Sequence, residues 1–389
     1  MLALFRYINR SAILAKEENM GFRIPLTPAE FDETIVEKLM RTKWPDVRLD
    51  AIALVDAALS SEGEERVSTA GRITFDAFYL NDSGLNLPKR LMIKVARPEF
   101  VEIPLYENEV NIYTRLGDEI RMRMPRCFGG FRDHESLSFG LVLEDLRTAH
   151  VTFENVLSRF GADDTAALLE QLALLHAPYW NSPRFNDDLH WVQPHTSGPI
   201  HDLFSLEKGS VHFLIEHEIA THHFKRELVE SVGQSAKSLA EQVARVQEHQ
   251  AGLACTLLHG DAHVGNTYKT SDGERGYLDF QLSARGFCMH DVSYTIVTSL
   301  SVQDRRQHEL HLINGYRERL IDLGVRTPPP LDLLFEEHRR SMAWNLYIGW
   351  LTSPTENYGL EITVGNLIRI ATAYHDLDSA AAIAQLPKQ

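Results

Sequence analysis

Residues 257–281 read LLHGDAHVGNTYKTSDGERGYLDFQ, and the rest of the chain is best interpreted outward from them. Leu257 and Leu258 form a short apolar run typical of a buried strand, so Asp261 follows directly after a predicted strand. A side chain at a strand end has the rigid support that a reactive carboxylate needs. Asn266 and Asp279 come later in the same stretch, and both carry oxygen atoms suited to Mg²⁺.

The order and spacing of these three side chains match those of phosphoryl-transfer sites. Such sites hold an aspartate that receives a hydroxyl proton, an asparagine five residues later and a second aspartate downstream. Asp261 is therefore the predicted catalytic base. Asn266 and Asp279 are the predicted Mg²⁺ ligands, and ATP is the expected phosphoryl donor.

A second interpretation uses part of the same stretch. His259, Asp261 and His263 alternate along the chain and offer nitrogen and oxygen ligands to a transition metal. That interpretation leaves Asn266 and Asp279 without a role, so we favour the phosphoryl-transfer site. We expect His263 to hydrogen-bond the backbone and hold the shape of the loop.

Upstream, residues 90–97 (RLMIKVAR) form an apolar strand with Lys94 in its middle. A lysine in a buried strand needs an anionic partner, although an edge-strand lysine that points to water is the simpler alternative. A predicted helix over 104–117 follows and carries Glu107 and Glu109. Kinases pair a strand lysine with a helix glutamate to hold the α- and β-phosphates, so Lys94 and one of these glutamates are candidates for that pair.

Before this strand, the sequence predicts a hairpin. Residues 66–67 and 73–79 are expected as strands, joined by a turn of small residues at 68–72. Ser68 and Gly71 in that turn would let backbone N–H groups approach a phosphate, although a plain hairpin turn explains the same residues. The chain contains neither GxxxxGK nor GxGxxG, so P-loop and Rossmann sites are not predicted.

The chain is predicted to contain two lobes after an N-terminal lead-in. The lead-in covers 1–45 and holds a helix capped by Thr27 that ends near residue 41. An N-lobe is expected over 46–146, ending after the apolar strand 139–143, and a C-lobe over 147–389. Helices of the C-lobe are predicted at 163–177, 210–250, 291–300, 304–323, 331–351 and 361–375.

Composition limits the class of protein and its partners. The 389 residues, 44% hydrophobic and 24% charged, are typical of a globular protein with sizeable cores. The net charge of -15 disfavours nucleic acid as a partner. The chain has no apolar run of membrane-spanning length. The apolar stretch in MLALFRYINR, at its start, is too short for a signal peptide. Three scattered cysteines predict no disulfide framework and a cytoplasmic location.

Taken together, these motifs resemble the aminoglycoside phosphotransferase and choline kinase-like superfamily. The resemblance is carried by HGDxHxxN at 259–266 and DFQ at 279–281. Four further motifs bring the chain closest to the ecdysteroid kinase-like branch: Glu109-x-x-x-Tyr113, Leu143-Glu144-Asp145-Leu146, Leu175-His176-Ala177 and Asp291-Val292-Ser293-Tyr294.

The resemblance implies an α+β fold of the protein-kinase type, with an antiparallel sheet and a helix in a small N-lobe and a larger, mainly helical C-lobe. It selects Glu109 over Glu107 as the partner of Lys94, and it implies that Glu144 and Leu146 contact adenine through their backbone. It also implies that Asp291 is a buried carboxylate that supports the catalytic loop.

These observations predict a kinase that phosphorylates a hydroxyl group of a small molecule. The region 331–375 lacks a carboxylate cluster for a polycationic sugar, so an apolar or amphipathic alcohol, for example a steroid-like one, is favoured. Its aromatic side chains, Trp344, Tyr347 and Trp350, are expected to pack in the core. The alternative is a catalytically silent nucleotide-binding protein of the same fold, and a protein kinase is disfavoured because Gln281 stands in place of the usual glycine.

Overall fold

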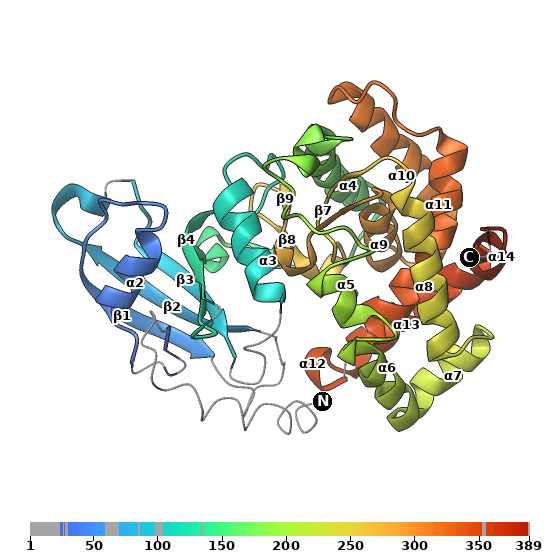
Figure 1. The fold of residues 1–389 in the computed structure, drawn as a ribbon, viewed down its shortest axis with the longest axis horizontal. Helices are drawn as coiled ribbons and strands as arrows, with labels where there is room; N and C mark the ends of the chain where they lie inside the picture. Colours follow the sequence, from blue (N-terminus) through green and yellow to red (C-terminus); the bar gives the residue numbers. More distant parts are fainter. Residues whose placement is uncertain are drawn as a thin grey trace. The chain divides into compact units, whose positions relative to one another are not determined.

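The computed structural model describes residues 24–25, 27, 30–58, 70–84, 86–97, 104–133, 135–351 and 355–387. The chain forms two compact units (Figure 1). Unit 1 comprises Met1–Glu119 and Met124–Val151, and unit 2 comprises Ile120–Arg123 and Thr152–Gln389. Each unit has a hydrophobic core of its own.

Unit 1 is built on a five-stranded antiparallel sheet with the strand order β1-β2-β3-β5-β4 (Figure 1). Its strands are β1 (Leu49–Ala58), β2 (Ala70–Tyr79), β3 (Arg90–Ala96), β4 (Cys127–Arg132) and β5 (Phe139–Glu144). The helix α3 (Leu105–Asn111) continues as a wider π-type turn, Ile112–Leu116. The strand predicted at 90–97 and the helix predicted at 104–117 are therefore confirmed.

Alternation along β3 explains why this strand lies inside the sheet. Leu91, Ile93 and Val95 are fully buried and belong to one face. Lys94 lies on the opposite face and pairs with Arg72 of β2 on one side and Leu141 of β5 on the other. Lys94 is thus in a central strand, and the edge-strand alternative for this lysine is wrong.

The predicted turn at 68–72 is wrong where the structure describes it. Gly71 and Arg72 lie inside β2, where Gly71 pairs with Val95 of β3. The partner strand of β2 toward the N-terminus is β1, which the sequence pattern did not predict. Ser68, the other residue assigned to phosphate contact, lies outside the described residues.

The helix α2 (Glu33–Met40) packs on the sheet of unit 1, and Val36, Leu39 and Met40 enter its core. Close approach is possible because Gly129 of β4 has no side chain: a Cβ there would lie 2.2 Å from the Leu39 carbonyl oxygen. The predicted cap at Thr27 is wrong. Asp32 caps the helix instead, because its carboxylate accepts the Ile35 N–H at 3.0 Å.

Unit 2 is mainly helical (Figure 1). Its longer helices are α4 (Ala162–His176), α6 (Ser210–Thr221), α7 (His223–Ser231), α8 (Ala236–Ala251), α9 (Met289–Ser299), α10 (Val302–Asp322), α11 (Leu331–Trp344) and α13 (Leu360–Asp376). Shorter helices are α5 (Pro199–Phe204), α12 (Thr355–Tyr358) and α14 (Ser379–Ala384), and a π-type turn, Asn345–Trp350, extends α11. The predicted C-lobe helices are present, with 210–250 divided into three.

Two small antiparallel sheets in unit 2 hold the stretch at 257–281. One pairs β7 (Thr256–Leu258) with β10 (Ala284–Gly286). The other has the order β6-β8-β9, from Thr152–Phe153, Thr267–Lys269 and Arg275–Tyr277. The helix α9 packs behind them, and every one of its residues is buried.

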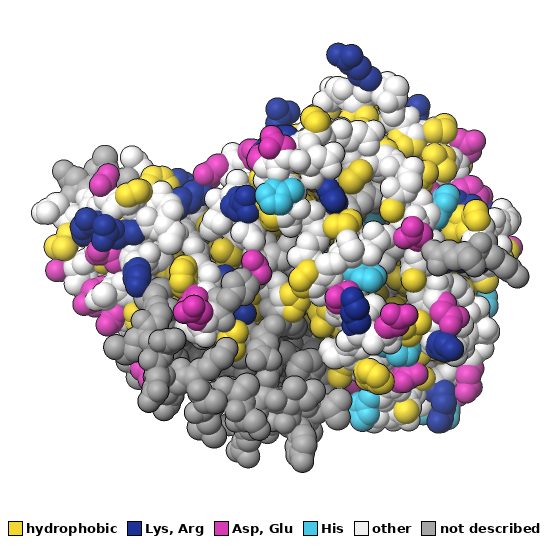
Figure 2. Space-filling model, viewed as in Figure 1, with side chains coloured by type: hydrophobic (Ala, Val, Ile, Leu, Met, Phe, Trp, Pro, Cys, Tyr) yellow, Lys and Arg dark blue, Asp and Glu magenta, His cyan; other side chains and the backbone are white. Residues whose placement is uncertain are grey.

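Figure 2 shows acidic and basic side chains interspersed over the face in view, without a continuous basic patch among the residues coloured there. None of the helices in the described parts is long and apolar enough to cross a bilayer. Cys127, Cys255 and Cys288 are free thiols.

Candidate active site

The candidate catalytic loop, residues 259–266 and called the catalytic loop below, follows the buried strand β7 and is held by one carboxylate. Asp291, fully buried at the start of α9, accepts the backbone N–H groups of His259 at 2.6 Å and Gly260 at 2.9 Å. His176 lies 3.2 Å from the same carboxylate, and its other ring nitrogen contacts the Tyr316 hydroxyl at 2.6 Å. The geometry is that of a carboxylate supporting the loop, and His176 is a fully buried core histidine.

Asp291 stays ionised because of these contacts. Burial by itself would raise the pKa of its carboxyl group, but the hydrogen bond from His176 and the surrounding imidazoles lower the pKa to about 2. A buried carboxylate with several donors can therefore fix the start of the loop over the physiological pH range.

Gly260 has a backbone conformation that suits glycine alone. Its φ is +85°, and a Cβ at this position would lie 1.9 Å from the Leu282 carbonyl oxygen. Its own carbonyl accepts a hydrogen bond from His290 Nε2 at 3.0 Å. Both polar backbone groups of Gly260 are thus held by the start of α9, one residue before Asp261.

Asp261 is oriented by Asn266. The Asn266 side-chain amide donates to the Asp261 carboxylate and to the Asp261 backbone carbonyl, each at 3.0 Å. The Asp261 side chain is 20% exposed, so a substrate can reach it. Burial is the main cause that raises its pKa to about 6, His259 opposes the shift, and nearby Asp279 adds to it.

Asp279 is brought beside Asn266 by the backbone. The N–H of Leu278, the residue before Asp279, donates to the Asn266 carbonyl at 2.9 Å. Asp279 itself adopts a left-handed conformation, with φ +70°. Such backbone strain in a non-glycine residue is characteristic of functional sites, and the two predicted Mg²⁺ ligands lie at one end of the same small sheet.

The two histidines of the loop are structural. His259 donates from Nε2 to the Leu278 carbonyl at 3.1 Å and accepts the Asp261 N–H at Nδ1, so both ring nitrogens are engaged. His263 accepts the Gly265 N–H at 3.0 Å and so holds the loop, as predicted. A transition-metal site at His259, Asp261 and His263 does not fit this geometry.

In unit 1, Lys94 and Glu109 form the predicted pair. The Lys94 Nζ atom lies 2.8 Å from each oxygen of the Glu109 carboxylate. The Glu109 side chain is 1% exposed and that of Lys94 14%, whereas Glu107 is exposed. Glu144 ends β5, and Leu146 begins a short 3₁₀ turn two residues later.

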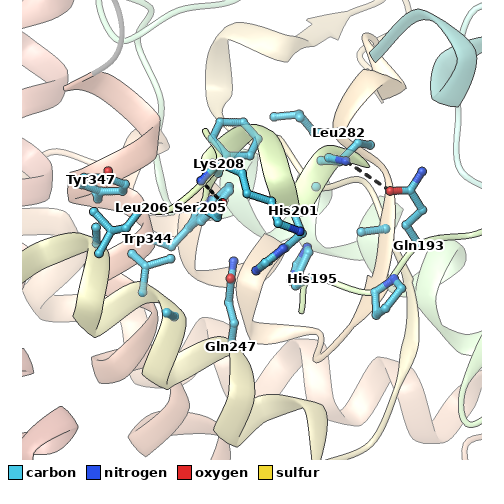
Figure 3. A pocket seen from close by; sticks show the side chains of 18 of the residues that line it. Gln193, His195, His201, Ser205, Leu206, Lys208, Gln247, Leu282, Trp344 and Tyr347 are labelled. Carbon is cyan, nitrogen blue, oxygen red and sulfur yellow. Dashed lines mark hydrogen bonds between the residues drawn. The ribbon is translucent and has the colours of Figure 1, made fainter. Parts of the chain in front are cut away.

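A cavity of about 390 Å³ lies in unit 2 beside the catalytic loop (Figure 3). Gly260, Leu282 and Ala284 form one side, and Trp344 and Tyr347 belong to the other. Ile200, Phe204, Leu206, Ala240 and Val243 add apolar lining, and the uncharged or weakly basic polar lining comes from Gln193, His195, His201, Ser205 and Gln247. Trp344 and Tyr347 are buried in the core as predicted, but they also line this cavity.

The charged side chains of the cavity lie at its rim. Glu207 and Lys208 line it and are exposed. Lys208 is also 3.0 Å from the carboxylate of Asp202. The two rim charges have opposite sign, so the cavity has no net charge that would attract a cationic ligand.

Comparisons with known proteins now identify the family. The model of the ecdysteroid kinase-like family matches residues 62–326, which is more than half of the chain. The chain belongs to the ecdysteroid kinase-like family. This is a family of small-molecule kinases, and it is the family that the motifs predicted.

Solved structures show that this ecdysteroid kinase-like protein has the two-lobed, kinase-like fold predicted. A provisionally named aminoglycoside phosphotransferase from Ralstonia eutropha has a TM-score of 0.50 and 12% identity, covering 90% of this chain and 99% of that one. A choline kinase from Streptococcus pneumoniae has a TM-score of 0.46 and 12% identity, covering 90% and 98%.

An aminoglycoside phosphotransferase from Streptomyces rimosus, solved with ADP and streptomycin, has a TM-score of 0.40 and 13% identity, covering 76% of this chain and 96% of that one. No match was found among curated proteins.

Two residues of this site were missed in the sequence. His290 directly precedes Asp291, so its position beside the Asp-Val-Ser-Tyr motif was the available signal. His195 lies in the irregular segment between α4 and α5 and comes next to the loop only through tertiary packing. Its ring lies 4.3 Å from that of His290.

Proposed function

We propose that this ecdysteroid kinase-like protein transfers the γ-phosphoryl group of ATP, with Mg²⁺, to a hydroxyl group of a small, neutral and largely apolar alcohol. The observation that carries the proposal is the orientation of Asp261. Its carboxylate is fixed by Asn266 on a loop that Asp291 supports, one residue from the cavity.

The side chains at Asn266 and Asp279 fit a divalent cation. Because the Asn266 amide nitrogen is directed to Asp261, its oxygen is the end left to face a ligand. Asp279 adds a carboxylate close enough to raise the pKa of Asp261. Bound there, Mg²⁺ would neutralise negative charge on the phosphate oxygens.

Asp261 would act on the acceptor hydroxyl. As the acceptor oxygen bonds to the γ-phosphorus, the bond from the γ-phosphorus to the bridging oxygen breaks, ADP leaves and the hydroxyl proton passes to Asp261. A pKa of about 6 leaves the carboxylate mostly ionised at neutral pH while keeping it basic enough to accept a proton.

Lys94 would contact the α- and β-phosphates of ATP. Glu109 supports this role because it fixes the Lys94 ammonium group at a defined place on the sheet. Glu144 and Leu146 stay proposed as backbone contacts of adenine. Gly71 is no longer proposed as part of a phosphate-binding turn, because it lies in β2.

The acceptor is proposed to occupy the cavity beside Gly260. Its volume of about 390 Å³ is near the lower end of the range for small-molecule sites, roughly 300–1,000 Å³. The apolar and aromatic lining favours an alcohol with an apolar body. The balanced rim charges give a polycationic sugar no advantage.

A transfer assay tests this function. The protein is incubated with ATP, Mg²⁺ and a panel of neutral alcohols that includes steroids, and phosphorylated products are identified by mass spectrometry. Asp261→Asn should lower kcat by roughly 10²–10⁴-fold, whereas Asp272→Asn, in the exposed β8–β9 turn, should leave kcat unchanged. Nucleotide binding without any transfer would instead support the silent nucleotide-binding protein.

A further inference from the structure

Two histidines whose rings pack against each other join the cavity to the loop at 259–266. His195 lines the cavity, and its ring packs 4.3 Å from that of His290. The Trp344 ring packs against both, 4.7 Å from His290 and 6.1 Å from His195. Figure 3 shows His195 and Trp344 among the side chains around this cavity.

His195 is held in place by backbone contacts. The Arg285 N–H donates to the Gln193 carbonyl at 2.8 Å, and Pro194 forms a parallel bridge with Arg285. These contacts attach the His195 segment to β10, beside Gly286. The imidazole therefore occupies its place on the cavity wall without needing a hydrogen bond from its own ring.

The polar groups around the cavity differ in what they already bind. Gln193 accepts the Ile200 N–H at 3.2 Å, and the Tyr347 hydroxyl contacts His212 at 2.5 Å. His201 and Lys208 are both within ion-pair distance of Asp202. Among the described residues, no hydrogen bond engages the ring of His195, so its nitrogen atoms are available to a ligand.

The neutral form of His195 suits this role. Burial, and then the nearby His290, lower its pKa well below 6.5, so at neutral pH it offers one N–H donor and one acceptor nitrogen. Such a group can recognise a hydroxyl or carbonyl group in an otherwise apolar cavity without favouring a charged ligand.

His290 contacts both His195 and the catalytic loop. Burial also lowers its pKa, and its Nε2 donates to the Gly260 carbonyl at 3.0 Å. Gly260 directly precedes Asp261, and its N–H is held by Asp291. The ring orientation of His290 therefore helps to set the position of the residue next to Asp261.

Building on the proposed function, we propose that His195 is a specificity-determining residue that hydrogen-bonds a second polar group of the acceptor. His290, packed against it, is the positioning residue that holds Gly260 and thereby Asp261. The acceptor class is then a neutral alcohol with a second hydroxyl or carbonyl group on its apolar body.

Binding of matched probes tests the role of His195 without turnover. A steroid diol and the mono-ol that lacks its second hydroxyl are titrated calorimetrically against the protein with ADP and Mg²⁺. His195→Phe keeps an aromatic ring packed against His290 but removes the nitrogen atoms. It should weaken diol binding by about 5–20-fold, the cost of one lost hydrogen bond in a buried site, and change mono-ol binding by less than about twofold.

His190→Phe is the control, since this exposed histidine lies in the same segment and outside the cavity lining. It should leave the affinity for both probes unchanged. Equal weakening of both probes by His195→Phe, or no weakening of either, overturns the assignment. It is also overturned if the wild-type protein binds neither probe.

Turnover of ATP separates this inference from the proposed function. With an acceptor that is phosphorylated, His290→Phe should lower kcat by about tenfold or more through displacement of Asp261, with KM for the acceptor little changed. His290→Gln should restore much of kcat because its amide can donate to Gly260. A fall in melting temperature without this split between kcat and KM would show a purely structural role.

If the diol binds selectively through His195 but no phosphate is transferred, the proposed function fails while His195 keeps its role in recognition.

Discussion

At the scale of single residues, the Lys94–Glu109 pair illustrates how burial selects between two equivalent candidates. Both Glu107 and Glu109 precede Tyr113 on one helix, yet Glu109 is buried against Lys94 and Glu107 is exposed. A buried carboxylate beside a lysine is a costly arrangement unless the pair is kept together. The ion pair is therefore expected to matter for nucleotide binding.

We predict that Glu109→Gln raises KM for ATP by about tenfold or more, because Lys94 loses the anion that holds its ammonium group in place. Glu107→Gln, the same change on the exposed side of the same helix, should leave KM within about twofold. Steady-state kinetics with varied ATP measure both. Equal effects from the two variants would mean that the pair has no special role.

His263 provides a prediction about pH and stability. Burial lowers its pKa from 6.5 to about 4, with Asp279 opposing the shift. Between these pH values the unfolded chain binds a proton that the folded chain does not, so stability is present above pH 6.5 and is lost as the pH falls toward 4. Within that interval, the free energy of unfolding decreases by about 1.4 kcal/mol for each unit by which the pH falls.

Urea unfolding at pH 7.5 and 5.5 tests this. His263→Asn keeps an acceptor for the Gly265 N–H but has no titrating ring. When the pH is lowered from 7.5 to 5.5, its free energy of unfolding should therefore fall by about 1 kcal/mol less than that of the wild type. The exposed His190→Asn should retain the wild-type difference, and an unchanged pH response in His263→Asn would contradict the prediction.

At the scale of elements, the catalytic loop depends on close packing of two backbone segments. Gly260 has a positive φ, and its Cα lies against the Leu282 carbonyl. Gly273, in the β8–β9 turn, also has a positive φ, +94°, but no atom lies within 4 Å of its Cβ position. Alanine at Gly273 would therefore add backbone strain alone, whereas alanine at Gly260 would add both strain and a steric clash.

We predict that Gly273→Ala costs about 1–2 kcal/mol, the left-handed strain alone. Gly260→Ala should cost clearly more, because a backbone carbonyl at 1.9 Å must also move, and it should abolish transfer by displacing Asp261. Denaturant unfolding and kcat measure the two effects. Similar losses of stability at both positions would show that the backbone at Leu282 moves readily to accommodate a Cβ at residue 260.

At the scale of the whole molecule, a ligand that binds only the folded chain must stabilise it. Mg²⁺–ATP at 100 times its Kd adds about 2.7 kcal/mol, which for a chain of this length raises the melting temperature by about 3 °C. Asp279→Asn should lose the part of this rise that depends on Mg²⁺. Asn is the matched change because it tolerates the left-handed backbone of Asp279.

The same rise in the presence of EDTA, or in Asp279→Asn, would remove Asp279 from the metal site. Absence of a rise with any nucleotide would remove ATP from the proposed function.

Local patterns were enough to predict much of this fold. The strand around Lys94 alternates buried and less buried residues, and α8 and α11 of unit 2 have a clear apolar periodicity. The strand β1 was missed because its sequence, LDAIALVDAA, is rich in alanine and many of its residues are exposed. An edge strand of that kind is defined by pairing with β2 and has little signal of its own.

The helix start at Asp32 was missed for a related reason. Thr27-Pro28 has the local features of a helix N-terminus, but Asp32 carries the carboxylate that accepts the Ile35 N–H. Val36, Leu39 and Met40, which follow it, are the residues that the sheet buries. Packing on the sheet therefore selected one of two plausible caps.

The sequence by itself determined the chemistry that we propose: Asp261, Asn266 and Asp279 were predicted from their type and spacing, which form a short, local motif. Only the tertiary structure decided which side chains surround that loop. His290 and His195, which were not predicted, reach it from a helix start and an irregular segment, and the cavity lies between parts of the chain distant in sequence. Those contacts come from packing of non-local elements, for which no short pattern exists.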